Sequence, residues 1–190
     1  NVDIVLVDNK SGGFNATQYL IELGHNRIGC IAGPSPVTPS AMRVEGFKQA
    51  LQEAKLAVDP ALILPGDYRF SSGEKVMRSL LMNPSPPTAV FASNDMMALG
   101  AIKAIHENGL KIPEDISVIG FDNIPLSQAT YPSLTTISQP IQEMAALVVN
   151  LLVERMKFQD QRVKLLEEEP DFRRVVLQTE LIVRNSCREI

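Results

Sequence analysis

Several residue types that mark common classes of protein are scarce in this sequence. It has no tryptophan, two histidines and two cysteines among 190 residues. Cys30 lies inside an apolar run and Cys187 near the end of the sequence, so we expect free thiols in a reducing cytoplasm and treat a disulfide between them as the less favoured alternative. His25 and His106 are far apart, and neither has the spacing of a metal-ligand set. We therefore expect no bound metal.

Long apolar runs and clusters of basic residues are also missing. No run approaches the roughly 18 apolar residues that cross a bilayer, so we expect no membrane partner. The net charge is −4, and the 18 lysines and arginines are dispersed along the chain. Because duplex DNA attracts a concentrated basic patch, this chain by itself is predicted to be a poor nucleic-acid binder.

The fingerprints of several enzyme classes are absent. No G-x-G-x-x-G follows a strand pattern, and neither a G-x-x-x-x-G-K-[ST] phosphate loop nor a G-x-S-x-G elbow occurs. We therefore expect a protein that is not an enzyme and that needs no cofactor.

The sequence does contain an alternation of short apolar runs and helical patterns. Ala89–Ala92 is a continuous apolar run, which is typical of a strand that is covered on both faces of a parallel sheet, and Ser117–Phe121 is predicted to be a second buried strand. Between them, Ala98, Ile102 and Ile105 recur at helical spacing. Similar runs continue along the chain, and their alternation with helices predicts an α/β fold with a parallel sheet.

Short polar residues follow two of the predicted strands. Asn94 and Asp95 come soon after the first, and Asp122 ends the second. Ligands bind at the carboxyl edge of open α/β sheets, so these side chains are candidates for a binding site. The alternative for each is a helix cap. Elsewhere, Ser71-x-x-Glu74 is a capping-box pattern that predicts a helix start at Ser71.

Seven strings in unbroken order carry a resemblance. They are VLVD at 5–8, LGHNRI at 23–28, GP at 33–34 with R-x-x-G-F at 43–47, TAVFASND at 88–95, PEDISVIGFD at 113–122, P-x-LTTI-x-QP at 132–140 and ELIVRNS at 180–186. Together they resemble the effector-binding region of the lactose-repressor (LacI/GalR) family of bacterial transcription regulators. The resemblance covers almost the whole sequence.

The resemblance implies a periplasmic-binding-protein-like fold of two Rossmann-like lobes with parallel sheets, the first lobe being incomplete. Residues 1–34 would form a partial N-terminal lobe, 35–134 the C-terminal lobe, and 135–190 a return segment to the N-terminal lobe with the terminal strands. Family members begin with a small helix-turn-helix domain that the sequence does not contain. Operator DNA would therefore be contacted only through that missing N-terminal domain.

The resemblance also implies a function. Family members bind a small effector, and effector-driven closure controls operator binding by the full-length homodimer in the cytoplasm. The segment Val37–Ser40 is less polar than in nucleobase-binding members, which favours a sugar or sugar phosphate as the effector. Two alternatives stay open: a periplasmic sugar-binding protein of a transporter, and a Mg²⁺-dependent α/β enzyme with Asp8, Asp95 and Asp122 as ligands.

Matching positions supply the candidate ligand-binding residues, which are Asp8, Arg43, Tyr68, Asn94, Asp95, Asp122 and Gln139. Arg43 would bind adjacent hydroxyls through its planar guanidinium fork, and Asp8 and Asp122 would accept hydrogen bonds from the ligand. Tyr68 would stack on a ligand ring, and Gln139 would contribute an amide. The alternatives are a solvated Arg43 paired with Glu45 or Asp67, a surface aromatic at Tyr68, and capping roles for the acidic residues.

Overall fold

The computed structural model describes residues 2–35, 38–165 and 172–190. The chain forms two compact units: unit 1 comprises Asn1–Asp8 with Pro140–Gln178, and unit 2 comprises Asn9–Gln139 with Thr179–Ile190. The predicted division at residue 34 therefore needs correction, since residues 9–34 belong to the larger unit. The reason is that strand β2 (Ile28–Ala32) pairs on both sides with strands of unit 2.

Unit 2 is built on one six-stranded sheet. Its strands are β3 (Ile63–Pro65), β2, β4 (Ala89–Ala92), β5 (Ser117–Asp122), β6 (Thr135–Ser138) and β8 (Glu180–Ile182), in that order across the sheet. All neighbouring pairs are parallel except β6 and β8, which are antiparallel. The predicted α/β class is confirmed, and the sheet is mostly parallel, with β8 as the antiparallel addition to the predicted parallel strands.

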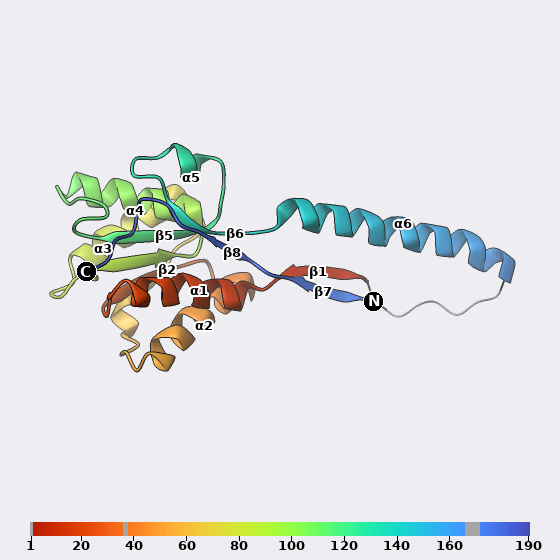
Figure 1. Cartoon of the computed structure of the whole chain (residues 1–190), viewed down its shortest axis with the longest axis horizontal. Coiled ribbons are helices and arrows are strands. Elements are labelled where there is room, and N and C mark those ends of the chain that lie inside the picture. The colour runs from red at the N-terminus through yellow and green to blue at the C-terminus, as the bar shows by residue number, and fades with distance from the viewer. Residues whose placement is uncertain (1, 36–37, 166–171) are drawn as a thin grey trace. The chain divides into compact units, whose positions relative to one another are not determined.

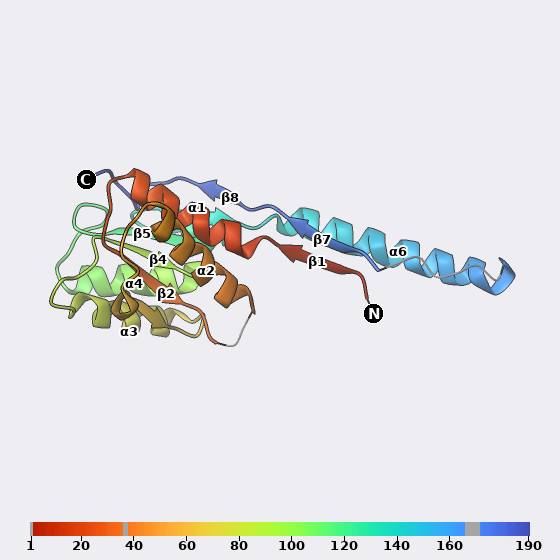
Figure 2. The same ribbon diagram turned by 90° about the horizontal axis from the view of Figure 1, so that it is seen from below.

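Helices cover both faces of this sheet. They are α1 (Asn9–Glu22), α2 (Thr38–Glu53), α3 (Phe70–Leu81), α4 (Asp95–Glu107), the short α5 (Leu126–Ala129) and the 3₁₀ turn η1 (Pro60–Leu62). Figure 1 shows α1 and α2 on one face and α3 and α4 on the other, and Figure 2 shows α1 and α2 from their own side.

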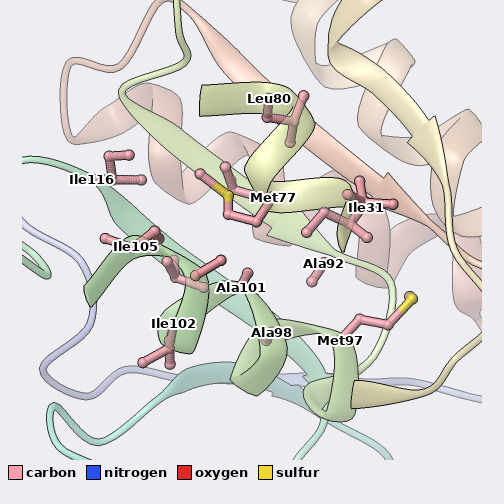
Figure 3. Packing of buried hydrophobic residues seen from close by; sticks show 14 of the residues in the cluster. Ile31, Met77, Leu80, Ala92, Met97, Ala98, Ala101, Ile102, Ile105 and Ile116 are labelled. Carbon is pink, nitrogen blue, oxygen red and sulfur yellow. The ribbon is translucent and has the colours of Figure 1, made fainter. Parts of the chain in front are cut away.

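The core lies in two clusters, one on each face of the sheet. Val90 and Ala92 of β4 pack toward the cluster formed with α3 and α4, which includes Met77 and Leu80 (Figure 3). The alternating residue Phe91 belongs to the cluster on the α1–α2 face. Because successive strand residues point to opposite faces, a strand covered on both sides must be apolar throughout, which explains the continuous runs in the sequence.

Glycines allow the helices on each face to approach one another closely. A Cβ atom on Gly46 of α2 would lie 2.0 Å from the carbonyl oxygen of Lys10 in α1, and one on Gly13 would lie 2.1 Å from that of Arg43. On the other face, a Cβ on Gly73 would lie 2.1 Å from the carbonyl oxygen of Met97. The α1–α2 contact fixes the backbone of Arg43 against α1.

Unit 1 contains strand β1 (Ile4–Val7), strand β7 (Arg174–Leu177) and helix α6 (Ile141–Leu165). The two strands are parallel partners. Asp3 accepts hydrogen bonds from the Arg155 side chain and from the Arg173 amide, and these bonds hold the pKa of its carboxyl far below the usual range.

In the described residues, no helix is both long and apolar enough to cross a membrane.

Several large apolar side chains of unit 1 are exposed. On α6 they are Ile141, Val148, Val149, Leu152, Val153 and Met156, and on the strands they include Ile4 and Val176. Exposed apolar side chains gathered on one helix, as on α6, are typical of surfaces that contact other proteins.

The predicted capping box at Ser71 is wrong. Helix α3 begins at Phe70, and its N-cap residue, Arg69, makes no side-chain capping hydrogen bond. Ser72 instead donates to the carbonyl oxygen of Arg69 and accepts from the Asp67 amide, at 2.9 and 3.1 Å. Ser72 thus stabilises the conformation of the loop at residues 67–69, which precedes helix α3.

Both cysteines are free thiols, as expected, and burial raises the pKa of each to about 12. The side chain of His25 is buried, and its ring nitrogens lie 2.9 Å from Thr88 Oγ1 and 3.0 Å from Ser117 Oγ. His25 therefore ties the start of three strands together, and burial lowers its pKa.

Replacing Gly46 by alanine tests the close helix contact. The added methyl group would meet a backbone carbonyl that cannot rotate away, so we expect the free energy of unfolding to fall by about 3 kcal/mol. The control is Gly109→Ala, where φ is +75° but no atom lies within 4 Å of the new Cβ. We expect a loss of about 1 kcal/mol there. If urea denaturation shows that Gly46→Ala and Gly109→Ala lose the same free energy of unfolding, the close helix contact is not what makes Gly46 necessary.

Candidate ligand-binding site

Arg43 is the centre of the candidate site. Its side chain is only 7% exposed. The Nε atom donates to Asn9 Oδ1 at 2.8 Å, and Nη1 donates to the carbonyl oxygen of Ser93 at 2.6 Å. The guanidinium carbon lies 3.6 Å from the ring centroid of Phe121, within cation–π range. The start of helix α1, the residue that follows strand β4, and strand β5 therefore all contact the same guanidinium.

The alternative partners considered for Arg43 have other contacts. Glu45 forms an ion pair with Lys10 at 2.6 Å. Asp67 accepts a hydrogen bond from the Arg69 amide at 2.9 Å. A solvated Arg43 paired with Glu45 or Asp67 is therefore not what the chain forms.

Asp122, the last residue of β5, is the acidic partner of Arg43. Its Oδ1 atom lies 3.4 Å from Arg43 Nη1 and accepts from Gln139 Nε2 at 2.6 Å. The Asp122 side chain is 27% exposed. Among the described residues, neither Asp122 Oδ2 nor Arg43 Nη2 makes a hydrogen bond. One acceptor and one donor of the pair are thus left for a ligand.

Burial has the largest influence on the protonation of both members of the pair. It raises the pKa of Asp122 and lowers the pKa of Arg43. The charge of each partner opposes the shift of the other, and Gln139 further stabilises the carboxylate. A partly desolvated pair of opposite charges interacts more strongly with a polar ligand than an exposed pair would.

Tyr68 lies in the loop between β3 and α3, in a left-handed conformation with φ of 69°. A Cβ atom on Gly33 would lie 2.4 Å from its ring, so the half-buried ring packs on the backbone at the end of β2. Its carbonyl oxygen accepts from Asn94 Nδ2 at 3.0 Å. The side chain is therefore not a free surface aromatic.

Asn94 and Asp95 both have structural partners. Asn94 caps α4, because its Oδ1 accepts from the Met97 amide at 2.9 Å. Asp95 is fully buried: its Oδ1 accepts from Thr136 Oγ1 at 2.6 Å, and its Oδ2 accepts from the Ile124 amide at 2.9 Å. Burial raises the pKa of Asp95 to about 6.

The predicted residues therefore fall into groups. Arg43, Asp122 and Gln139 are joined by hydrogen bonds, and Asn94 is joined to Tyr68. Asp8 lies in unit 1, where its amide donates to the Leu177 carbonyl oxygen at 2.9 Å. Val37, which entered the prediction of effector class, lies outside the described residues.

Sequence reasoning missed three residues that surround Arg43: Asn9, Phe121 and Ser93. Asn9 and Phe121 directly adjoin the predicted residues Asp8 and Asp122, which is the only signal that could have found them. Ser93 contributes its carbonyl oxygen, and its buried hydroxyl has no partner among the described residues.

No group of three or more histidine, cysteine, aspartate or glutamate side chains could hold a metal ion among the described residues. Both carboxylate oxygens of Asp95 are already hydrogen-bonded within unit 2.

The Arg43–Asp122 pair lies at the carboxyl edge of a mostly parallel sheet, which is the edge where open α/β folds bind ligands. Residues 17–187 match the family described as periplasmic binding protein-like domain, and the chain belongs to that family. Within it, the chain corresponds to the effector-binding region of LacI-family regulators, which confirms the resemblance seen in the sequence.

Curated relatives and solved structures agree on this placement. The chain is 45% identical over 186 residues to the transcriptional repressor CytR of Escherichia coli K12, covering 98% of this chain and 52% of CytR. The chain thus spans about half the length of the curated relatives that it matches.

Two solved structures contain sugars. A complex of the regulator CelR with cellobiose is 37% identical, with a TM-score of 0.85, over 97% of this chain and 54% of CelR. A LacI-family regulator from Enterococcus faecium with bound ribose is 34% identical, with a TM-score of 0.85, over 99% of this chain and 66% of that one.

The raised pKa of Asp95 predicts how stability depends on pH. Burial raises this pKa from 3.8 to about 6, so the contribution of Asp95 to stability is fully present below the unfolded value and is lost as pH rises through about 6. Relative to the uncharged variant Asp95→Asn, the wild type should lose on the order of 2–3 kcal/mol between about pH 4 and pH 7. The free energies of unfolding are measured by urea denaturation across this pH range. If those of the wild type and of Asp95→Asn change with pH in the same way, the raised pKa of Asp95 is refuted.

Proposed function

We propose that this chain is the effector-binding region of a bacterial LacI-type transcriptional regulator and that it binds a sugar or sugar phosphate. The observation that carries the proposal is the Arg43–Asp122 pair, which keeps Nη2 and Oδ2 free of hydrogen bonds to the described residues. The structures of relatives with cellobiose and ribose support a carbohydrate as the ligand class.

The chemistry of the pair suits neighbouring hydroxyl groups. A guanidinium offers donors in a fixed plane, and the adjacent carboxylate accepts from the same or the next hydroxyl. Asn9 and Ser93 hold the plane of Arg43, while Phe121 excludes water from one side of it. The ligand therefore meets donors and acceptors that are already oriented, so less conformational entropy is lost on binding.

The other predicted residues take different roles in this proposal. The Tyr68 ring would pack on the C–H face of a sugar, and Gln139 would orient Asp122 and contact the ligand at its edge. Asp8 stays a predicted contact. Asn94 and Asp95 would shape the site through Tyr68 and the turn after β5, because their side chains are occupied within unit 2.

An effector regulates only by binding one conformation of the regulator better than another. Changing a population from about 1:99 to 99:1 requires roughly 5.5 kcal/mol of differential affinity. We propose that this preference controls operator binding by a full-length homodimer in the cytoplasm, with DNA contacted through a separate helix-turn-helix domain. The exposed apolar residues of α6 would contribute to the dimer contact.

The relatives favour a regulator over the two alternatives. CytR and CelR are named as a repressor and a regulator, which argues against a sugar-binding protein of a transporter and against a catalytic role. Titration with Mg²⁺ checks the second point, since Mg²⁺ binding without any carbohydrate binding would favour the enzyme alternative.

The ligand contacts are tested by calorimetric titration of the purified protein with D-ribose, cellobiose and the nucleobase hypoxanthine. We expect one of the two carbohydrates to bind, and Arg43→Lys and Asp122→Asn each to weaken its affinity by about 10- to 100-fold through loss of a charge-assisted hydrogen bond. Arg27→Lys is the matched control, since Arg27 pairs with Asp59, away from the site, at 3.3 Å. If hypoxanthine binds and neither carbohydrate does, the ligand is a nucleobase and not a carbohydrate. If both site variants bind the carbohydrate with unchanged affinity, the proposed site is refuted.

A further inference from the structure

The turn that presents Asp122 has an unusual backbone. Asp122 has φ of 113° and the next residue, Asn123, has φ of 56°. Two successive non-glycine residues in the left-handed region persist only where the surrounding structure holds them there. The turn at residues 122–124 therefore depends on support from neighbouring groups.

Asp95 holds the turn from helix α4. Its Oδ2 accepts from the Ile124 amide at 2.9 Å, directly after the two left-handed residues. Its Oδ1 accepts from Thr136 Oγ1 of β6 at 2.6 Å. A Cβ atom on Gly120 would lie 2.2 Å from Oδ1, so β5 leaves room for the carboxylate only because residue 120 is glycine. Gly120 and Thr136 are register partners, which places both beside the same carboxylate.

Arg184 holds the same turn from the segment after β8. Its Nη2 donates to Asn123 Oδ1 at 2.7 Å, and its Nη1 donates to the carbonyl oxygen of Leu134 at 2.6 Å. Asn123 Nδ2 in turn donates to Ser138 Oγ at 3.2 Å. The side chains of Asp95, Arg184 and Ser138 thus bind Asn123 or Ile124, and of these three Asp95 bonds to the main chain of the turn.

We propose that Asp95 is a positioning residue of the ligand site: seated over Gly120 and held by Thr136, it anchors the Ile124 amide and thereby keeps the Asp122 carboxylate at Arg43. This inference rests on the proposed function of the Arg43–Asp122 pair, and it gives Asp95, which the sequence predicted as a ligand contact, a role that needs no contact with the ligand. It also gives a physical reason for a fully buried carboxylate at the first position of α4.

Amide hydrogen exchange measured by NMR on the ¹⁵N-labelled protein tests the anchor without any ligand. In Asp95→Ala, we expect the Ile124 amide to exchange about 10- to 100-fold faster, which corresponds to the loss of one hydrogen bond to a charged group. In Asp95→Asn, the amide oxygen can still accept from Ile124 and the amide nitrogen can donate to Thr136, so protection should be restored. Asp115→Ala is the matched control, because Asp115 makes the same kind of bond to the Lys111 amide at 2.7 Å.

The contact of Asp122 with Arg43 is tested by a second measurement, the pH titration of the Asp122 carboxyl ¹³C resonance, because that contact influences the pKa of Asp122. We expect Asp95→Ala to shift the titration midpoint of Asp122 and Asp95→Asn to shift it less, since only the former frees the turn. If Asp95→Ala does not fold, Thr136→Val removes one of the two bonds to the carboxylate and should also accelerate exchange at Ile124. Unchanged exchange at Ile124 in the folded variant would overturn the proposal.

Titration of the same variants with D-ribose and cellobiose links the anchor to binding. We expect about tenfold weaker binding in Asp95→Ala and wild-type binding in Asp95→Asn and Asp115→Ala. Faster exchange at Ile124 with unchanged carbohydrate affinity would overturn the positioning role while leaving the proposed function intact. Absence of carbohydrate binding in the wild type would refute the proposed function, and the exchange and ¹³C data would still decide whether Asp95 positions Asp122.

Discussion

A guanidinium that is almost completely buried must be surrounded by acceptors, because an unpaired charge in the interior is strongly unfavourable. In this chain, the partners of Arg43 come from the start of α1, the end of β4 and the end of β5. A shift of any of these elements would remove one of the hydrogen bonds to the buried guanidinium. The requirement to satisfy Arg43 therefore links the relative placement of the elements that form the candidate ligand site.

Close backbone packing makes this arrangement possible. The glycine contacts between α1 and α2 allow Arg43 to reach Asn9 across the helix pair, and Gly120 leaves space in β5 for Asp95. At both places, a single methyl group would separate groups that must touch. The polar site thus depends on small residues that carry no chemistry themselves, and its geometry is a property of the packing.

Much of the fold was predictable from local patterns, and some of the site was. Continuous apolar runs identified β4 and β5 because strands covered on both faces have no polar side. The resemblance to LacI-family regulators supplied Arg43 and Asp122, which the structure brings together. It did not supply Asn9, whose role appears only once α1 packs against α2. The division at residue 34 failed because strand order within a sheet is not a local property of the sequence.

The sequence by itself determined the α/β class, the family and the residues with binding chemistry. The tertiary structure decided which of those residues have groups left for a ligand. Asn94, Asp95 and Asp122 all follow strands and all can accept an amide hydrogen, so composition and spacing cannot separate them. Their contacts differ: Met97, Ile124 and Thr136 bind the side-chain oxygens of the first two, whereas Asp122 binds Arg43 and Gln139 through Oδ1 and has no partner at Oδ2 among the described residues. These partners lie up to 79 residues apart and meet only in the folded chain.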